Sequence, residues 1–421
     1  MFGKTKKKSD DIDELIISDL GVNKDTANKG ASRKKVSVKT IFDLKKINIK
    51  TFALSVLAFL LLITFIFIFR FVNFNATILL WKTGIAKSSE NVNNKSIEYE
   101  SFKNGLMRVS NDGMTYIDEN GSIKWTVSYN MKDPIYEKNG NYFVIADRNG
   151  NKFYVFNKDG KVGENTTTNP IVKISVSEEG VTYILQSDEN SSYINVFRET
   201  GVPIDITIKT NLTEDGMPID LGTSDNGEEL VVAYVCLNDD SIYTKATYYN
   251  FADAGKNANQ KRIVAEFKDE LNNKFLARVK FFDNTKSCLI YDGGIYYVST
   301  ADESNPSFSN NLRFDDKMKS ISYNEKYIAV VFENDKLMSF DTNGNTLCSR
   351  EIISNYDEFY IDDDYIVFLY GNRVIIYDIR GRMIFDKEVN SFVQYVAKKK
   401  SLFFTELLLG LIDGVECVRF Y

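Results

Sequence analysis

The sequence contains no histidine among its 421 residues, and this absence removes several kinds of chemistry. Without histidine, neither a Ser-His-Asp triad nor a Cys-His pair is available for nucleophilic catalysis. A histidine-ligated zinc, copper or non-haem iron site is excluded for the same reason. An enzyme built on this chain would have to use carboxylates, lysine, tyrosine or a cofactor.

Cysteine is also scarce. The four cysteines are 52, 60 and 69 residues apart, a spacing without a CxxC or metal-binding pattern: Cys236, Cys288, Cys348 and Cys417. Each lies in an apolar, strand-like segment, which favours buried free thiols over disulfides. A domain of this size has enough core to be stable without covalent cross-links. Phosphate-binding loops of the GxxxxGKS/GxxxxGKT or strand-GxGxxG-helix type are absent as well.

One long apolar run stands out from the rest of the chain. Thr51–Phe69 has nineteen residues with no charge, proline or glycine. A helix of that length spans about 28 Å, close to the hydrocarbon thickness of a bilayer. We therefore predict a transmembrane helix over residues 51–72. A cleaved signal peptide is the competing interpretation, but the positive segment is long and no Ala-x-Ala-like site follows.

The distribution of charge predicts the orientation of this helix. Residues 1–50 hold 13 of the 52 basic and 7 of the 58 acidic side chains, so they carry +6 and the rest carries −12. Because Lys/Arg-rich flanks stay inside, we expect a cytoplasmic N-terminus and an extracytoplasmic C-terminal part of a single-pass cell-membrane protein. The acidic outer part argues against nucleic acid as a partner. We expect a juxtamembrane linker over residues 73–96, with Trp81 in an interfacial segment over 76–81.

Residues 97–421 read as all-β repeats. Runs rich in Val, Ile, Tyr and Phe end at Asn/Asp-Gly turns, as residues 135–162, 328–347 and 365–385 illustrate. We interpret the recurring glycines as hairpin-turn residues with positive φ. They are separated by 39, 41, 54, 89 and 37 residues, and the longest interval contains a repeat without the glycine, residues 293–308: Gly121, Gly160, Gly201, Gly255, Gly344 and Gly381.

A period near 40 residues with four strands per unit indicates a β-propeller. Seven such turns are followed by an eighth unit, from Ser391 to Tyr421, that lacks its outer strand. We predict eight blades, with residues 85–96 supplying the missing strand and closing the ring. Seven blades is the alternative, and a β-sandwich or two stacked barrels is the competing fold.

Two resemblances accompany these repeats. The turn in Tyr116–Trp125, YIDENGSIKW, is similar to that of quinoprotein-type propeller repeats. The chain as a whole resembles an uncharacterised family of Gram-positive single-pass membrane proteins with an extracytoplasmic quinoprotein-like or WD40-like propeller, through Glu100–Gly121, Met217–Val235 and Tyr248–Lys256. This resemblance implies the fold but no activity. Only Trp125 lies in a blade and no two cysteines are adjacent, so we expect no quinone cofactor.

Two acidic segments are candidates for metal binding. Asp362-Asp363-Asp364 offers oxygen ligands for Ca²⁺, but adjacent residues point in different directions and a solvated loop is the simpler interpretation. Asp341–Asn345 has its glycine at position four instead of six and no closing glutamate, so it is not a calcium loop. We therefore predict no catalytic, cofactor-binding or metal-binding residues.

The N-terminal tail contains one patterned segment. We expect residues 1–50 to be largely disordered, with a short helix over 9–21 that begins near Ser9 or Asp10 and ends at Gly21. Its apolar face would fold onto a cytoplasmic protein, and an accidental pattern in a disordered tail is the alternative: Ile12, Leu15, Ile16 and Leu20.

Together these features predict a non-enzymatic binding or scaffold module in the cell envelope. Its protein partners would bind the propeller outside and the tail inside. The alternative is a carboxylate-based envelope hydrolase or lyase acting on glycans. That alternative requires two or three inward-facing acids, together with aromatic side chains, at one mouth of the propeller channel.

Overall fold

The structure is a computed structural model, in which the chain forms two units, Met1–Phe71 and Val72–Tyr421. The described residues are 49–71, 77–85, 97–238, 241–259, 261–389, 391–401 and 404–420. The predicted docking helix over 9–21 therefore lies outside them.

In the first unit, the described residues form helix α2 (Ile49–Phe71), which contains the apolar run. Its large apolar side chains between Phe52 and Ile66 are exposed. Over the described part of the chain, no helix combines the length and the apolar character needed to cross a membrane.

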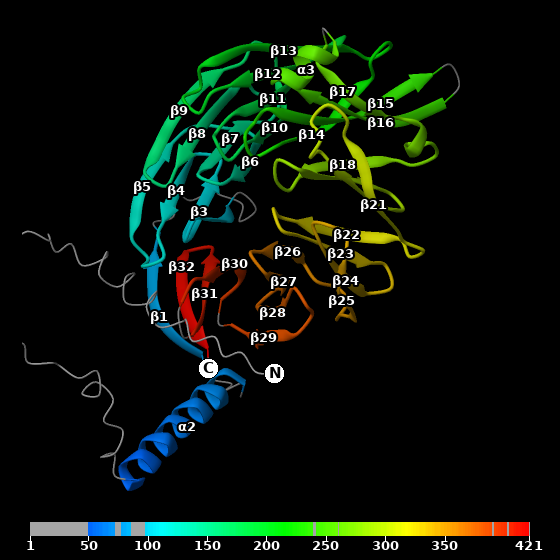
Figure 1. Ribbon diagram of the computed structural model, residues 1–421. Helices are drawn as coiled ribbons and strands as arrows, with labels where there is room; N and C mark the ends of the chain where they lie inside the picture. Colours follow the sequence, from blue (N-terminus) through cyan, green and yellow to red (C-terminus); the bar gives the residue numbers. More distant parts are fainter. Residues whose placement is uncertain are drawn as a thin grey trace, which may run out of the picture. The chain divides into compact units, whose positions relative to one another are not determined.

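The second unit is a ring of four-stranded antiparallel sheets, or blades (Figure 1). In chain order, blade 1 consists of β2 (Glu98–Phe102), β3 (Gly105–Ser110), β4 (Gly113–Ile117) and β5 (Ile123–Ser128), and blade 2 consists of β6 (Pro134–Asn139), β7 (Tyr142–Asp147), β8 (Lys152–Asn157) and β9 (Gly160–Thr166). Blade 3 consists of β10 (Ile171–Val176), β11 (Thr182–Ser187), β12 (Ser191–Phe197) and β13 (Pro203–Asn211), and blade 4 consists of β14 (Met217–Thr223), β15 (Glu229–Asn238), β16 (Ser241–Asn250) and β17 (Ile263–Phe267).

The other four blades complete the ring. Blade 5 consists of β18 (Leu276–Phe281), β19 (Lys286–Tyr291), β20 (Gly294–Ser299) and β21 (Ser307–Arg313), and blade 6 consists of β22 (Met318–Tyr323), β23 (Tyr327–Phe332), β24 (Lys336–Asp341) and β25 (Thr346–Glu351). Blade 7 consists of β26 (Glu358–Asp362), β27 (Tyr365–Tyr370), β28 (Arg373–Asp378) and β29 (Met383–Glu388), and blade 8 consists of β30 (Val393–Lys399), β31 (Thr405–Leu411), β32 (Gly414–Phe420) and β1 (Thr77–Gly84). Eight blades, as the repeat spacing predicts, are confirmed.

Blade 8 is closed by a strand from the N-terminal side of the propeller, as expected, but the position predicted for that strand was wrong. The outer strand is β1, whose pairing with β32 runs from Thr77 opposite Phe420 to Gly84 opposite Gly414. Residues 85–96 follow this strand, so the expected 73–96 linker contains part of the propeller.

Trp81 also differs from its predicted place in an interfacial segment. It lies in β1 opposite Cys417, and its ring packs against Gly121, where an added Cβ would be 2.6 Å from the indole. The aromatic and β-branched residues of TILLWKTG suit a strand, and a blade neighbour covers Trp81.

The core of the described propeller consists of eight apolar clusters, each between two neighbouring blades. The cluster between blades 8 and 1 closes the ring and includes Tyr99, Leu106, Tyr395 and Leu408. The four cysteines are buried and free, so that prediction is confirmed. Blades thus bury their faces against one another, as a propeller requires.

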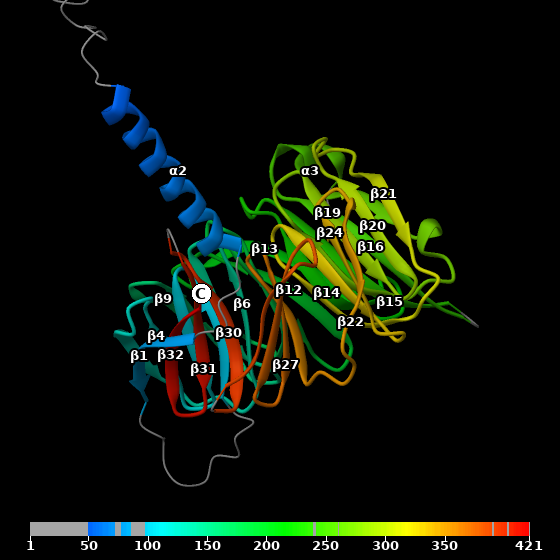
Figure 2. The same cartoon turned by 90° about the horizontal axis from the view of Figure 1, so that it is seen from below.

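Strand direction divides the turns between two faces of the ring. We call the face with the turns between first and second and between third and fourth strands the hairpin face. The crossover face carries the turns between second and third strands and the connections from blade to blade. Figure 2 shows the strands of blade 8 side by side between these faces.

Five of the six marker glycines have positive φ between third and fourth strands, Gly160 as the first residue of β9 and the others in the turns themselves: Gly121, Gly201, Gly344 and Gly381. The interpretation of Gly255 as a hairpin-turn glycine was wrong. It lies in helix α3 (Asp253–Ala258), where an added Cβ would be 1.7 Å from the Asn250 carbonyl oxygen. Close backbone packing, and not a positive φ, requires glycine there. Blade 4 is thus elaborated, and the 3₁₀ turn η4 (Asp269–Leu271) follows β17.

Candidate functional site: an acidic pocket on the hairpin face

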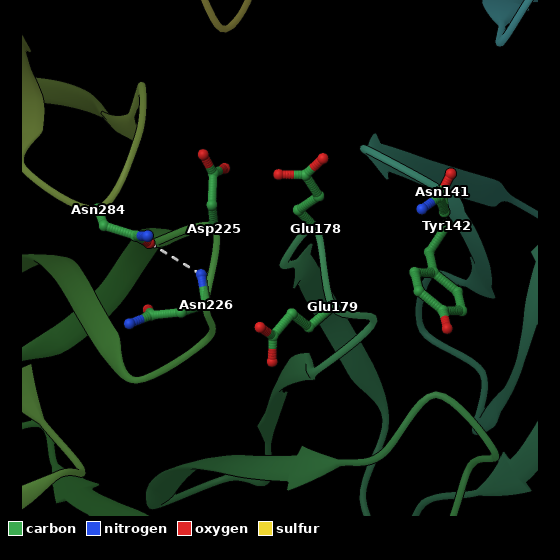
Figure 3. A pocket seen from close by; sticks show the side chains of 7 residues that line it. All are labelled: Asn141, Tyr142, Glu178, Glu179, Asp225, Asn226 and Asn284. Carbon is green, nitrogen blue, oxygen red and sulfur yellow. Dashed lines mark hydrogen bonds between the residues drawn. The ribbon is translucent and has the colours of Figure 1, made fainter. Parts of the chain in front are cut away.

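A cavity of about 490 Å³ lies on the hairpin face, where turns of blades 2 to 5 meet. Each of these blades contributes through the turn between its first and second strands. The cavity is lined by acidic and amide side chains with a single aromatic ring (Figure 3): Asn141, Tyr142, Glu178, Glu179, Asp225, Asn226 and Asn284.

The turn of blade 3 holds its two glutamates by local hydrogen bonds. Gly180 N donates to Ser177 O over 3.0 Å, and Val181 N donates to Ser177 Oγ over 3.0 Å. The turn of blade 2 packs beneath the Glu178 side chain. Gly140 has φ of 50°, and an added Cβ would stand 2.1 Å from Glu178 Cγ. The missing side chain at position 140 therefore lets Glu178 lie directly over that turn.

Asp225 is the partly buried acid of the pocket. Asn139 Nδ2 donates to Asp225 Oδ1 over 3.2 Å. Burial raises the pKa of Asp225, the Asn139 hydrogen bond opposes this, and the neighbouring Glu178 raises it further. Asn226 N donates to Asn284 Oδ1 over 2.9 Å, which joins the turns of blades 4 and 5.

The carboxylates of Glu178 and Glu179 make no hydrogen bond or ion pair with other described residues. Figure 3 shows the side chains of Glu178 and Asp225 directed the same way. Ionised carboxylates are pure acceptors, so this arrangement suits a ligand that brings donors and positive charge, such as an ammonium or guanidinium group. Among the described residues, no three His, Cys, Asp or Glu side chains are grouped to hold a metal ion.

A second polar cluster lies on the first strands of blades 1, 2, 7 and 8. Lys138 Nζ is 2.7 Å from Glu100 Oε1 and donates to Ser101 Oγ over 2.8 Å. Tyr395 Oη donates to Asp362 Oδ1 over 3.4 Å. Burial lowers the pKa of Lys138, but Glu100 and Asp362 outweigh it and the net pKa is raised. These contacts join four blades and are satisfied within the fold.

The Asp362-Asp363-Asp364 run departs from the predicted solvated loop at Asp362, which ends β26, whereas Asp363 and Asp364 form the turn between β26 and β27. Asp362 is 5% exposed and accepts a hydrogen bond of 2.7 Å from Lys398 N. Burial raises the pKa of Asp362, and Lys138 opposes that rise. Asp363 pairs with Lys326 over 3.0 Å, and Asp364 pairs with Lys398 over 2.5 Å. All three carboxylates therefore have protein partners.

Asp341, in the rejected calcium loop, caps the turn between β24 and β25. Its Oδ1 accepts hydrogen bonds of 2.9 Å from both Asn343 N and Asn345 N. The pocket residues, in contrast, were missed by the sequence analysis. A signal existed, because the turns between the first two strands of blades 3, 4 and 5 begin with SEEG, SDNG and FDNT. An alignment of blades, instead of a search for local motifs, would have placed them side by side.

The ring of eight four-stranded blades defines this molecule as an eight-bladed β-propeller. The chain belongs to DUF5711, a family of unknown function, whose model matches residues 82–417. The resemblance to an uncharacterised propeller family is confirmed to that extent. No curated protein matches the chain.

Several solved structures are similar in fold. The computationally designed Ika8 protein is 13% identical with a TM-score of 0.52, covering 77% of this chain and 96% of its own. Sqt1 from Saccharomyces cerevisiae is 12% identical with a TM-score of 0.51, covering 81% and 97%. BamB from Moraxella catarrhalis is 11% identical with a TM-score of 0.49, covering 82% and 100%. At these identities the similarity shows the fold alone.

Proposed function

We propose that this protein is a membrane-anchored binding module whose propeller captures a cationic group of a protein partner in the hairpin-face pocket. One observation carries the proposal. Glu178 and Glu179 are exposed beside a cavity of about 490 Å³, and neither carboxylate has a hydrogen bond or ion pair among the described residues, although Lys103 interacts with Glu178 at longer range. Carboxylates left unpaired in a shared recess are best stabilised by a ligand that supplies the missing donors.

Anchoring by a single membrane helix is part of this proposal. The uncharged run Thr51–Phe69 and the charge difference between the tail and the remainder support it. The exposed apolar side chains around α2 are also better covered by lipid than by water. The tail would then be cytoplasmic and the propeller extracytoplasmic, in the cell envelope.

A non-enzymatic role is favoured by the absence of histidine. One observation supports the second candidate, a carboxylate-based glycan hydrolase or lyase. Burial raises the pKa of Asp225, which lies beside the acid Glu178, and a carboxyl of raised pKa next to a second carboxyl is the kind of pair that glycoside hydrolysis uses. Tyr142 is the single aromatic side chain among the lining residues, which provides little stacking surface for a sugar.

The test removes charge from the pocket without changing its shape. In the full-length protein, Glu178→Gln/Glu179→Gln should weaken binding of a fluorescein-labelled hexalysine peptide at least about tenfold at low salt. The matched control, Asp112→Asn/Glu189→Gln, removes two exposed acids from the crossover face and should leave binding unchanged. Equal affinities of the two double variants would refute the pocket as the cation site.

The same proteins can separate the other parts of the proposal. Partners cross-linked in membranes should be lost with Glu178→Gln/Glu179→Gln if the pocket recruits them. A chain lacking residues 1–45 should retain those partners and lose the ones that bind the predicted helix over 9–21. If the wild-type protein releases reducing ends from purified cell-wall glycan and Asp225→Asn abolishes this release, the protein is a hydrolase and the binding function is refuted.

A further inference from the structure

Blade 4 carries a two-stranded ribbon that the described residues of the other blades do not form. Strands β15 and β16 are ten residues long, and they are longer than every other described strand. The β14 ladder ends at Val235 and the β17 ladder ends at Ala246, so Cys236–Asn238 and Ser241–Lys245 extend beyond both neighbours. Figure 1 shows the two strands reaching outward past the rest of the blade.

On the side that faces blade 5, the ribbon carries exposed apolar side chains, which together with Met217 and Phe275 we call the apolar shelf. Ile242 is 69% exposed, the highest value of any large apolar side chain described, and Leu237, directly opposite it, is 51% exposed. Met217 and Phe275, both about half exposed, continue this shelf. Met217 pairs with Val235 in the same ladder.

Phe275 is held next to the ribbon by hydrogen bonds on either side of it. Thr244 Oγ1 donates to Lys274 O over 2.9 Å and accepts from Leu276 N over 3.0 Å. The apolar side chains are therefore fixed together on the crossover face. Apolar surface of this kind on a rigid strand edge is typical of a binding site.

The ribbon also has strand edges without a neighbouring strand, and lysine side chains lie close to it. Beyond Val235 and Ala246, its outer edges have no strand partner in the described part of the chain. Lys268 Nζ lies 4.4 Å from the centre of the Tyr243 ring, and Lys274 Nζ lies 5.4 Å from that of Tyr296. Neither ammonium has a carboxylate partner among the described residues. Lys268 lies with Tyr243 on the blade 3 side of the ribbon, opposite Ile242, so an ammonium without a carboxylate partner lies next to the edge on that side.

We propose that an extended segment of a partner protein, with alternating apolar and acidic side chains, adds as a strand to this ribbon. Its backbone would pair with the free edge, its apolar side chains would cover Leu237 and Ile242, and its carboxylates, on the other side of the added strand, would meet Lys268. A strand is the occupant that matches all three features, because a lipid surface leaves edge N–H groups unpaired. This site is separate from the hairpin-face pocket.

The experiment uses full-length protein in lipid nanodiscs and a phage-displayed library of nine-residue peptides in which apolar residues alternate with glutamate or threonine. Enriched peptides should bind at least about tenfold more weakly to Leu237→Thr/Ile242→Thr, which removes apolar area but keeps strand propensity. The matched control is Ile123→Thr/Val202→Thr, whose residues are 47% and 53% exposed, at the first position of β5 and directly before β13. That control should bind like the wild type.

Methylating alternate peptide nitrogens tests strand pairing itself. Loss of binding on methylation supports the proposal, and unchanged binding would overturn it in favour of side-chain contacts alone. It is also overturned if no peptide is enriched, if Leu237→Thr/Ile242→Thr dissociates a dimer of the protein, or if that variant abolishes binding to vesicles of anionic lipid. Glu178→Gln/Glu179→Gln should leave peptide affinity unchanged, so failure of the pocket and failure of the ribbon are distinguishable.

Discussion

Ring closure should depend on a single hydroxyl at the junction of blades 8 and 1. Tyr99 is 3% exposed, and its hydroxyl lies within hydrogen-bond distance of two backbone carbonyls, Leu411 O at 2.8 Å and Gly414 O at 3.1 Å. Tyr99→Phe keeps the ring in place and leaves both carbonyls without this donor. A buried acceptor without a partner costs about 1–3 kcal/mol, so we expect the free energy of unfolding to fall by about 2 kcal/mol.

The chain provides a matched control for this substitution. The hydroxyl of Tyr297 is buried and has no hydrogen-bond partner among the described residues. Tyr297→Phe should therefore leave the free energy of unfolding unchanged or raise it by about 1 kcal/mol. Urea titrations of both full-length variants, followed by tyrosine and tryptophan fluorescence, measure the difference. Equal midpoints would refute the claim that the Tyr99 hydrogen bonds stabilise closure.

Two further predictions concern the hairpin face and the blade 4 core. Gly140→Ala should displace Glu178 and weaken hexalysine binding several-fold, whereas Gly371→Ala, with a similar φ of 64° and nothing within 4 Å of its added Cβ, should not; peptide titration measures this. Burial, with Glu303 nearby, raises the pKa of Glu229 from 4.5 to about 8. Because the folded state then holds a proton that the unfolded chain releases, the free energy of unfolding should fall as pH rises from about 5 to about 8. Glu229→Gln should flatten that slope in urea titrations at each pH.

The fold was accessible from sequence because each blade repeats one local code. Turn glycines such as Gly121 and Gly381 require positive φ, and this requirement marks third-to-fourth strand turns without reference to distant residues. Gly255 shows the limit of that code. Glycine also serves close backbone packing, and composition alone does not separate the two uses.

The closing strand was misplaced for a related reason. Thr77–Gly84 follows the long apolar run at a short distance, so Trp81 was interpreted as an interfacial anchor. Its partner β32 lies at least 330 residues away in sequence, at Gly414–Phe420. Local pattern gives strand propensity but not the register with so distant a partner, and that register decides which segment closes the ring.

The acidic pocket was inaccessible from sequence because its members come from four blades. Asn141 and Asn284 lie at opposite ends of that stretch, and only the curvature of the ring brings their turns to one recess. The same curvature explains Asp362. In sequence it is one of three equivalent aspartates, yet its position at the end of an inner strand buries it beside Tyr395 while Asp364 stays at the surface.

The two proposed binding surfaces lie on opposite faces of one rigid ring, and this has a consequence for their coupling. Strands of six residues, such as β10 and β18, separate the faces by about 20 Å at about 3.3 Å per residue. Glu178 and Asp225 lie at the hairpin-face ends of blades 3 and 4, and Ile242 extends beyond the crossover-face end of blade 4. No side chain is shared, and each blade core between them is fully packed. Because site energies at such separations are additive when no partner is shared, hexalysine and a ribbon-binding peptide should bind simultaneously, each with an affinity that the other leaves unchanged.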